Sequence, residues 1–226
     1  MFAGHFAVAL AAKRATPKTS LGTLVFGAQF LDLIWPILVL LGVEWFHIEP
    51  GVTKLNPLAF DHYPISHSLV MSLVWSVLVG AVYFWRRRSC RGAVVLGAAV
   101  FSHWVLDWIT HAPDLQLAPG AAARAGLGLW NHPAAAIALE GGLFVAAVAS
   151  YVTQTRAKDA VGRWSFFAFV FALALIQFAN TTGPPPPSMR AVAWSALIIW
   201  LFVPWAAWFD RHRAPRRLER GAILES

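Results

Sequence analysis

The stretch GAVVLGAAVFSHWVLDWITH, residues 92–111, is apolar in its first half and carries two histidines and one aspartate in its second half. An α-helix needs about 20 residues to cross a hydrocarbon core of about 30 Å. His103, Asp107 and His111 follow at intervals of four residues, so on a helix they cover an arc of about 80° and a rise of about 12 Å. The stretch predicts a membrane-spanning helix with a single polar stripe on one face.

The rest of the chain is equally apolar. Hydrophobic residues make up 58% of the 226 residues and charged residues only 13%, whereas soluble proteins hold about a quarter charged residues. Further spans are predicted at about 20–43, 65–85, 134–155, 164–182 and 190–209. The segment from Phe2 to Ala12 is too short to cross a bilayer and predicts a half-helix that dips toward the protein interior. The predicted fold class is all-α, a polytopic membrane helical bundle of about six transmembrane helices plus a short N-terminal half-helix.

The segments that join the spans are too short to form a separate soluble domain. Residues 1–226 are therefore expected to form a single integral membrane domain. Within it, residues 1–155 carry the intramembrane polar residues, residues 156–210 would be scaffold helices, and residues 211–226 would be a basic cytoplasmic tail. Because Cys90 is the single cysteine, the sequence excludes an intrachain disulfide and a cysteine-built zinc or iron–sulfur site.

Basic residues are distributed unevenly between the connecting segments. Of the 18 lysines and arginines, 15 lie on one side of the predicted bundle, and only Lys54, Arg124 and Arg190 lie on the other. Cytoplasmic loops carry the excess of Lys and Arg. The pattern therefore predicts a multi-pass membrane protein with both termini cytoplasmic and residues 44–64 and 112–133 outside. We do not expect nucleic acid as a partner, because anionic lipid headgroups explain the same charges.

Several ionisable side chains fall inside or at the mouth of the predicted spans, where each costs about 2.5–3.5 kcal/mol at the centre and requires a partner or a function. Outside the polar stripe, these residues are Asp32, His62, His67, His132 and Glu140. The predicted topology brings them and the stripe together at the outer half of the bilayer. His5 can join them only if the N-terminal half-helix reaches inward to the level of Asp32.

Neutral imidazole and carboxylate oxygen together are ligands of zinc, and also of manganese and iron. We therefore predict a divalent metal as cofactor, zinc first, with manganese or iron as alternatives. The candidate ligands are His5, Asp32, His62, His67, His103, Asp107, His111 and His132. The alternative interpretation is structural: His103 and Asp107 would form interhelical hydrogen bonds, and His62 and His67 would be a solvated pair at a helix start.

Four motifs carry a resemblance to a known family: AGHFAVAL at 3–10, QFLDLIWP at 29–36, FDHYPISHS at 60–68 and VFSHWVLDWIT at 100–110. Together they resemble the inner-membrane, metal-dependent hydrolase family typified by YdjM, also called the LexA-binding hydrolases, over roughly residues 1–115. The family pattern is an N-terminal glycine-histidine, a PDxDH-like segment, HRGxTHS and SHxxxD. The resemblance implies a location in a bacterial-type inner (plasma) membrane. It also implies a polar core of His5, Asp32, His62, His67, His103 and Asp107. Ile34, Trp35 and Tyr63 stand where the pattern has Asp, His and Arg.

The order of the polar residues is also similar, more weakly, to the ligand order of the zinc-dependent phospholipase C and P1 nuclease class, which is all-helical. His132 and Glu140 are eight residues apart here, where that class has four. This similarity favours phosphoester hydrolysis over peptide hydrolysis. The sequence also lacks the HExxH motif of metalloproteases, which points the same way.

These interpretations together predict a membrane-bound metal-dependent hydrolase that acts on a phosphoester or ester of a lipid or lipid-linked substrate through a metal-activated water. Glu140 and Asp114 are the candidate catalytic general bases. One alternative is an ion or metal transporter, which needs polar groups on both sides of the bilayer midplane. The other is a non-catalytic membrane interaction subunit, with which Ile34 and Trp35 are consistent.

Overall fold

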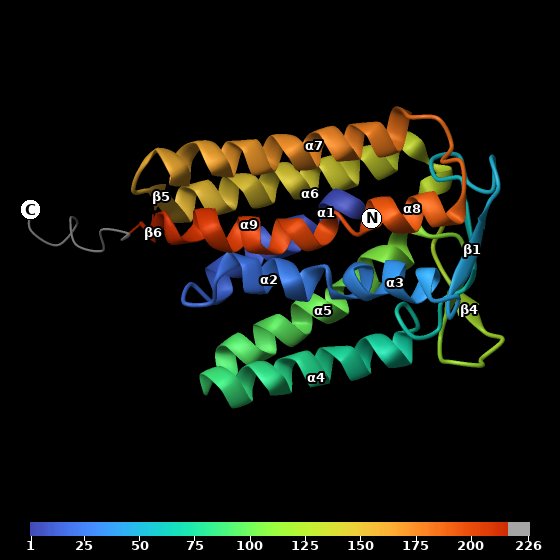
Figure 1. Cartoon of the computed structure of the whole chain (residues 1–226), viewed down its shortest axis with the longest axis horizontal. Coiled ribbons are helices and arrows are strands. Elements are labelled where there is room, and N and C mark those ends of the chain that lie inside the picture. Colours follow the sequence, from blue (N-terminus) through green and yellow to red (C-terminus); the bar gives the residue numbers. More distant parts are fainter. Residues whose placement is uncertain (217–226) are drawn as a thin grey trace, which may run out of the picture.

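The computed structural model describes residues 1–216 and consists mainly of helices that run side by side (Figure 1). The α-helices are α1 (Phe2–Ala15), α2 (Leu21–Ala28), α3 (Phe30–Leu40), α4 (Leu69–Arg87), α5 (Cys90–Thr110), α6 (Pro133–Gln154), α7 (Phe166–Thr182), α8 (Met189–Ala196) and α9 (Ile199–Arg211). Short helical turns are η1 (Leu129–Asn131) and η2 (Val161–Ser165). The strands are β1 (Trp45–Ile48), β2 (Leu58–His62), β3 (Leu115–Gln116), β4 (Arg124–Ala125), β5 (Thr155–Ala157) and β6 (Arg213–Pro215).

The predicted membrane bundle is confirmed. Five helical stretches are long and apolar enough to cross a membrane: Leu69–Arg87, Cys90–Thr110, Pro133–Gln154, Val161–Thr182 and Met189–Arg211. Helices α2 and α3 together form a sixth such stretch, bent by 54°. Each of the predicted spans therefore corresponds to one of these stretches. The last two are built from η2 with α7 and from α8 with α9.

The bend in the first span lies at Gln29, whose backbone leaves helical geometry (φ −98°, ψ 3°). Helix α2 packs against α1, α5 and α9, whereas α3 turns away and packs against α8. The bend places Asp32 in the first turn of α3 rather than in the middle of a continuous helix. A carboxylate at a helix N-terminus is favoured by the helix dipole.

Helix α1 lies in the interior of the bundle, packed against α6, α2 and α5, with its N-terminal end well inside the molecule (Figure 1). Its 14 residues confirm the predicted half-helix. Met1 is buried, so the first residues do not emerge at either end of the bundle. The last turn of α1, with Lys13 and Arg14, leads instead toward the end of the bundle where most of the basic residues lie, which is called the basic end below.

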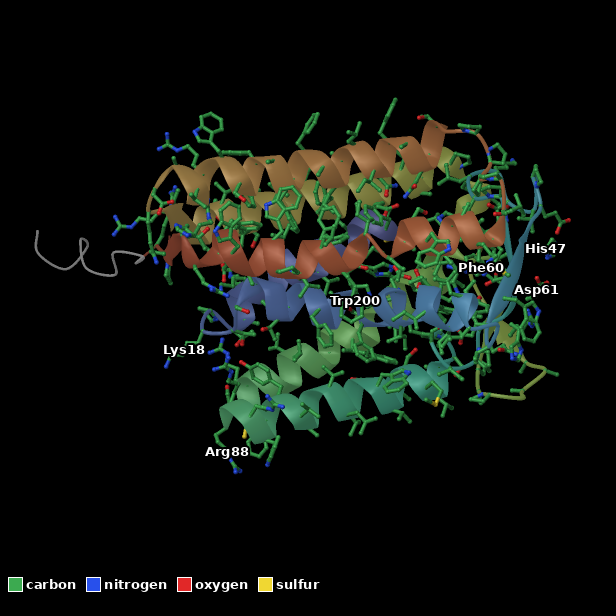
Figure 2. All side chains as sticks on the ribbon, in the orientation of Figure 1. Lys18, His47, Phe60, Asp61, Arg88 and Trp200 are labelled. Carbon is green, nitrogen blue, oxygen red and sulfur yellow. The ribbon has the colours of Figure 1, made fainter. Side chains whose placement is uncertain are left out.

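The two ends of the bundle differ in charge and in structure. Lys18 and Arg88 lie at one end, and His47 and Asp61 lie at the other (Figure 2). The end with His47 carries the antiparallel pairs β1–β2 and β3–β4, which close over the helix ends. At the basic end, β5 pairs with β6. Residues 217–226 of the predicted basic tail lie outside the described residues.

An apolar core fills the half of the bundle toward the basic end. Its fully buried side chains include Phe6, Leu10, Leu24, Phe169, Phe202 and Phe209. Polar side chains collect instead at the level where α1 begins, α2 gives way to α3, and α5 approaches its C-terminus. The packing therefore separates an apolar half from a polar centre near the stranded end.

Candidate metal centre

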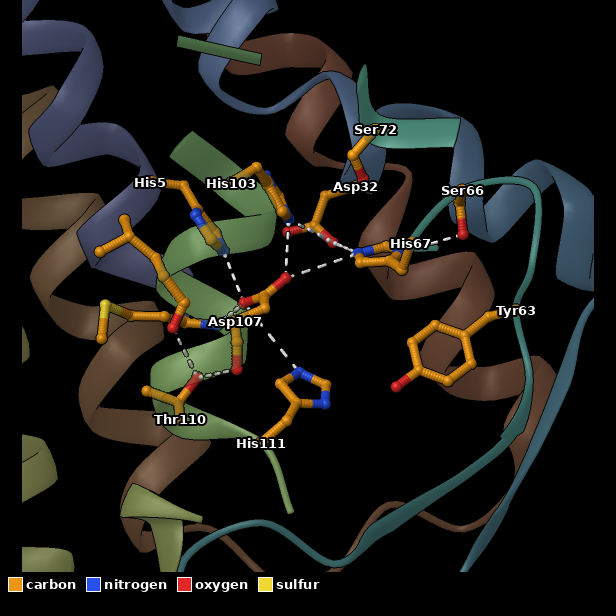
Figure 3. A network of polar contacts seen from close by, with 12 residues as sticks. His5, Asp32, Tyr63, Ser66, His67, Ser72, His103, Asp107, Thr110 and His111 are labelled. Atoms are coloured by element: carbon orange, nitrogen blue, oxygen red, sulfur yellow. Dashed lines mark hydrogen bonds and ion pairs between the residues drawn. The ribbon is translucent and has the colours of Figure 1, made fainter. Parts of the chain in front are cut away.

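The carboxylate of Asp107 lies at the middle of a group of imidazoles (Figure 3). Its Oδ2 lies 3.2 Å from Nε2 of His103 and 3.7 Å from Nε2 of His67. Its Oδ1 lies 3.1 Å from Nε2 of His5. His103 and Asp107 are both buried and one turn apart on α5, as the spacing predicts. The half-helix α1 brings His5 to the same level. His5 therefore meets the condition stated from the sequence, that this helix reach inward to the other polar residues.

Asp32 reaches the same point from the bend between α2 and α3. Its Oδ1 lies 3.5 Å from Nε2 of His67 and 3.6 Å from Nε2 of His103. Two overlapping sets, His5–His103–Asp107 and Asp32–His67–His103, have ligand atoms within 4.8 Å of one another. These five residues, His5, Asp32, His67, His103 and Asp107, are called the His/Asp cluster below.

The hydrogen bonds of His103 fix which of its ring nitrogens is free. Its Nδ1 lies 2.8 Å from the backbone carbonyl of Ala28. A carbonyl only accepts, so Nδ1 carries the hydrogen, and in the neutral ring Nε2 presents a lone pair. That lone pair has no hydrogen-bond partner and faces the carboxylates of Asp32 and Asp107. A buried lone pair that faces carboxylates is unfavourable unless a proton or a metal cation lies between them. A set of imidazole nitrogens and carboxylate oxygens at these distances fits a divalent metal.

His67 is held in the same way by a neighbouring chain of hydrogen bonds. The buried carboxylate of Glu44 accepts from the backbone N–H groups of Ile65 and Ser66 and, at 2.5 Å, from the Ser66 hydroxyl. Because that hydroxyl hydrogen is used, Ser66 Oγ accepts the hydrogen of His67 Nδ1, at 2.7 Å. Nε2 of His67 is therefore left with its lone pair toward the cluster. Such partners orient metal-binding imidazoles.

His111 stands at the edge of the cluster, just after the last turn of α5. Its Nε2 lies 4.0 Å from Asp107 Oδ1, and its Nδ1 lies 3.0 Å from Oδ1 of Asp114. The same Asp114 oxygen accepts the hydroxyl of Tyr63 at 2.7 Å. Burial, together with the charge of Asp114, raises the pKa of the Tyr63 phenol well above its ordinary value, so this hydroxyl remains a donor. In this structure Asp114 orients His111.

Glu140 lies in the wall of the site but outside the His/Asp cluster. Its Oε1 accepts the backbone N–H of Gly4 at 3.2 Å, and its Oε2 accepts Nε2 of Gln177 at 3.1 Å. The carboxylate thus satisfies a free N–H at the start of α1, where the helix dipole favours negative charge. The α-amino group of Met1 donates to Asp107 Oδ1 at 2.8 Å on the other side of the same turn.

Two predicted ligands lie away from the cluster. His62 ends strand β2 and stacks on Trp45 of β1, with ring centroids 4.1 Å apart. His132 is exposed at the N-terminus of α6. Spacing along the chain could not separate His62 from His67, because the strand pair turns one outward while the loop before α4 turns the other inward.

Glu44 and Ser66 are functional candidates that the sequence interpretation missed. Glu44 follows the first span and looked like an ordinary loop residue, whereas in the structure it is fully buried. A signal was present for Ser66, since it directly precedes His67 in the HS part of its motif. The predicted span at 65–85 also began too early: Ser68 caps α4, so His67 lies in the loop just before the helix.

The cluster forms one wall of a cavity of about 950 Å³. Asp32, His67, Asp107, His111 and Glu140 all line it. The other walls come from the β1–β2 loop, from the second half of α7 and from α8 and the start of α9. A volume near the upper end of the usual range for ligand pockets, about 300–1,000 Å³, leaves room for a substrate beside the cluster.

A profile of the YdjM inner membrane protein family matches residues 1–183. The match contains all of the His/Asp cluster and extends well beyond the expected residues 1–115. The chain belongs to the YdjM inner membrane protein family. It is thus a multi-pass inner-membrane protein, as predicted, and α8 and α9 lie beyond the part that matches the YdjM family. No curated protein and no solved structure is significantly similar to it.

Ser66 offers a direct test of how His67 is held. Ser66→Ala should weaken metal affinity by about 10- to 100-fold, the usual effect of losing a hydrogen-bond partner of a ligand. Ser66→Thr keeps the hydroxyl and should retain the parent affinity. Ser72→Ala is a matched control, because it removes a nearby buried hydroxyl that bonds to the Ser68 carbonyl instead. Equal metal affinity in Ser66→Ala and Ser72→Ala, measured by competition with a chelating dye, would contradict this role.

Proposed function

We propose that this protein is a membrane-bound metal-dependent hydrolase that cleaves a phosphoester or ester of a lipid or lipid-linked substrate. The observation that carries the proposal is the convergence of Nε2 of His67 and of His103 on the carboxylates of Asp32 and Asp107. Asp32, His67 and Asp107 line the cavity, and His103 lies buried behind them. Zinc is the first candidate metal, with manganese and iron as alternatives, because imidazole and carboxylate suit all three.

The His/Asp cluster would hold one or two ions, with Asp107 shared because its two oxygens face different imidazoles. His111 is a further ligand candidate, through the Nε2 that Asp114 turns toward Asp107. A divalent ion bound there would lower the pKa of a bound water and act as a Lewis acid toward a phosphoryl or carbonyl oxygen.

Protein groups would move the protons. Glu140 is the proposed general base, because it lines the cavity and its carboxylate bonds to Gly4, the residue directly before His5 of the cluster. Asp114 is a second candidate, although one of its oxygens already accepts two hydrogen bonds. A substrate held in the cavity would meet the cluster, and the apolar surroundings would exclude bulk water.

The test is hydrolysis by the purified protein. Detergent-solubilised protein, stripped with a chelator and reloaded with zinc, manganese or iron, is offered a lipid extract and separate phospholipid classes. We expect release of phosphate or of a phosphorylated headgroup that requires metal and disappears on chelation. Absence of any metal-dependent product with all three ions would reject the hydrolase proposal and favour a non-catalytic interaction subunit.

The transporter alternative fits the structure less well. An ion pathway needs polar groups through the full thickness of the membrane. Between the cluster and the Lys13–Asp210 ion pair near the basic end, α1 contributes the buried Phe6, Ala9 and Leu10. Among the described residues, this half of the bundle is the large apolar core.

We also propose that the cavity opens on the outer side of the membrane, on the basis of the asymmetry of the basic residues. Lys54→Cys, made in a Cys90→Ala background, should react with a membrane-impermeant maleimide in intact cells. Native Cys90, which is exposed at the basic end, should react only after permeabilisation. The reverse pattern would invert the orientation.

A further inference from the structure

The wall of the cavity opposite the His/Asp cluster is built from α7 and α8. Helix α7 packs against α9 and α1, whereas α8 leans over α3 and β1. Both α7 and α8 line the cavity, which therefore lies between them. The chain also leaves helical regularity here, since α8 ends at Ala196 and α9 begins at Ile199.

This wall is apolar and reaches the membrane-facing surface. Ile176, Val192 and Ile199 line the interior, and Trp194 and Ile198 line it while remaining 63% and 47% exposed. Because α7 and α8–α9 are membrane spans by length and hydropathy, the exposed parts of this wall face lipid. The cavity thus extends from the His/Asp cluster to the part of the protein surface that faces the hydrocarbon region.

The polar mouth of the same cavity carries a positive charge. Lys54, on the loop between β1 and β2, lines the cavity and is the only lysine or arginine that does so among residues 1–216. Gln177 and Asn180 of α7 add amide groups between the mouth and the apolar wall. Positive charge at one end and an apolar wall at the other match an anionic headgroup joined to a hydrocarbon tail.

We infer that the space between α7 and α8 is a lateral binding groove for the hydrocarbon tail of an anionic phospholipid, whose phosphate group lies between Lys54 and the His/Asp cluster. This inference rests on the proposed function and specifies how its substrate is held. The lipid enters sideways from the bilayer, so its tail stays in an apolar environment throughout. Helix α7 lies within the residues that match the YdjM family and α8 lies beyond them, so only the α8 side of this wall comes from outside that match.

The test uses a lipid that cannot be hydrolysed, so that binding is separated from turnover. The probe is the phosphonate analogue of an ether-linked phosphatidic acid with a photoactivatable diazirine in one alkyl chain, diluted into phosphatidylcholine vesicles that contain the protein. After irradiation, mass spectrometry locates the labelled residues. We expect labels to concentrate on the cavity-lining parts of α7 and α8 rather than on α4, whose outer face is the most exposed of the spans.

Matched substitutions on each wall decide whether the groove binds the tail. Ala179→Trp fills the α7 wall, whereas Ala174→Trp places the same ring on α7 away from the cavity. Labelling of the groove should fall by about tenfold in the first, the effect of keeping a few methylenes out of an apolar site, and should persist in the second. Ser195→Trp and Leu201→Trp repeat the comparison from the α8–α9 side, so the test survives if one variant fails to fold.

Metal content, measured on the same samples, reports whether each variant is intact. Labels spread evenly over all lipid-facing helices, or equal labelling of both members of each pair, would overturn the inference even if the protein hydrolyses a lipid. Concentrated labelling that is lost in Ala179→Trp would support the groove even if no hydrolysis is found. Labelling by a neutral diazirine phosphatidylcholine at the same level in Lys54→Gln, with loss of the phosphonate label, would support the assigned position of the phosphate.

Discussion

Replacing Asp107 with Asn should abolish tight metal binding, with affinity reduced by more than about 100-fold, beyond the usual cost of losing an outer partner of a ligand. The substitution keeps the shape of the side chain and removes its charge. It also places an amide N–H₂ group where a carboxylate oxygen faces His103 Nε2 at 3.2 Å. Nε2 of His103 would then accept a hydrogen bond from this amide, and its lone pair would no longer be available to a metal.

Metal content by mass spectrometry and thermal unfolding with and without metal measure this effect. Saturating metal should stabilise the parent by about 2.7 kcal/mol when its free concentration is 100 times the dissociation constant. The same metal should not stabilise Asp107→Asn. Asp61→Asn is the control, because Asp61 is a partly exposed aspartate at the same end that pairs with His47. Full metal occupancy in Asp107→Asn with parental stabilisation would remove Asp107 from the ligands.

Glu140→Gln should reduce turnover by about 10²- to 10⁴-fold while metal remains bound, since this is the range that a general base contributes. The structure gives Glu140 a second role, because it accepts hydrogen bonds from Gly4 and Gln177. A glutamine at position 140 has one oxygen in place of two, so it cannot accept from both Gly4 and Gln177, and its own N–H₂ group adds a donor where an acceptor is needed. Some loss of stability, about 1–3 kcal/mol for a buried group left unsatisfied, is therefore expected as well.

A double exchange separates the two roles. In Glu140→Gln/Gln177→Glu, the amide and the carboxylate change places, so the hydrogen bond and the net charge between α6 and α7 are restored. We expect the unfolding temperature to recover and turnover to stay low, because the carboxylate is no longer at position 140. Recovery of turnover together with stability would show that Glu140 serves only to hold the start of α1.

The sequence by itself determined the features that depend on residues close together along the chain. Hydropathy over about 20 residues located each membrane span, including the one that the structure bends at Gln29. Helical periodicity placed His103 and Asp107 on one face, because residues one turn apart are neighbours in any α-helix. Four short motifs, above all the two histidine motifs at 60–68 and 100–110, led to the YdjM family, which the match over residues 1–183 confirms.

Only the tertiary structure decided which of the polar residues meet. His5 and Asp32 join the cluster because α1 is packed inside the bundle and because the first span bends just before Asp32. His62 and His132 do not join, because a strand pair and a helix start hold them elsewhere. Glu44 reaches Ser66 across 22 positions of the chain. Such convergence depends on how separate helices and loops pack against one another, and no periodicity along a single segment encodes that packing.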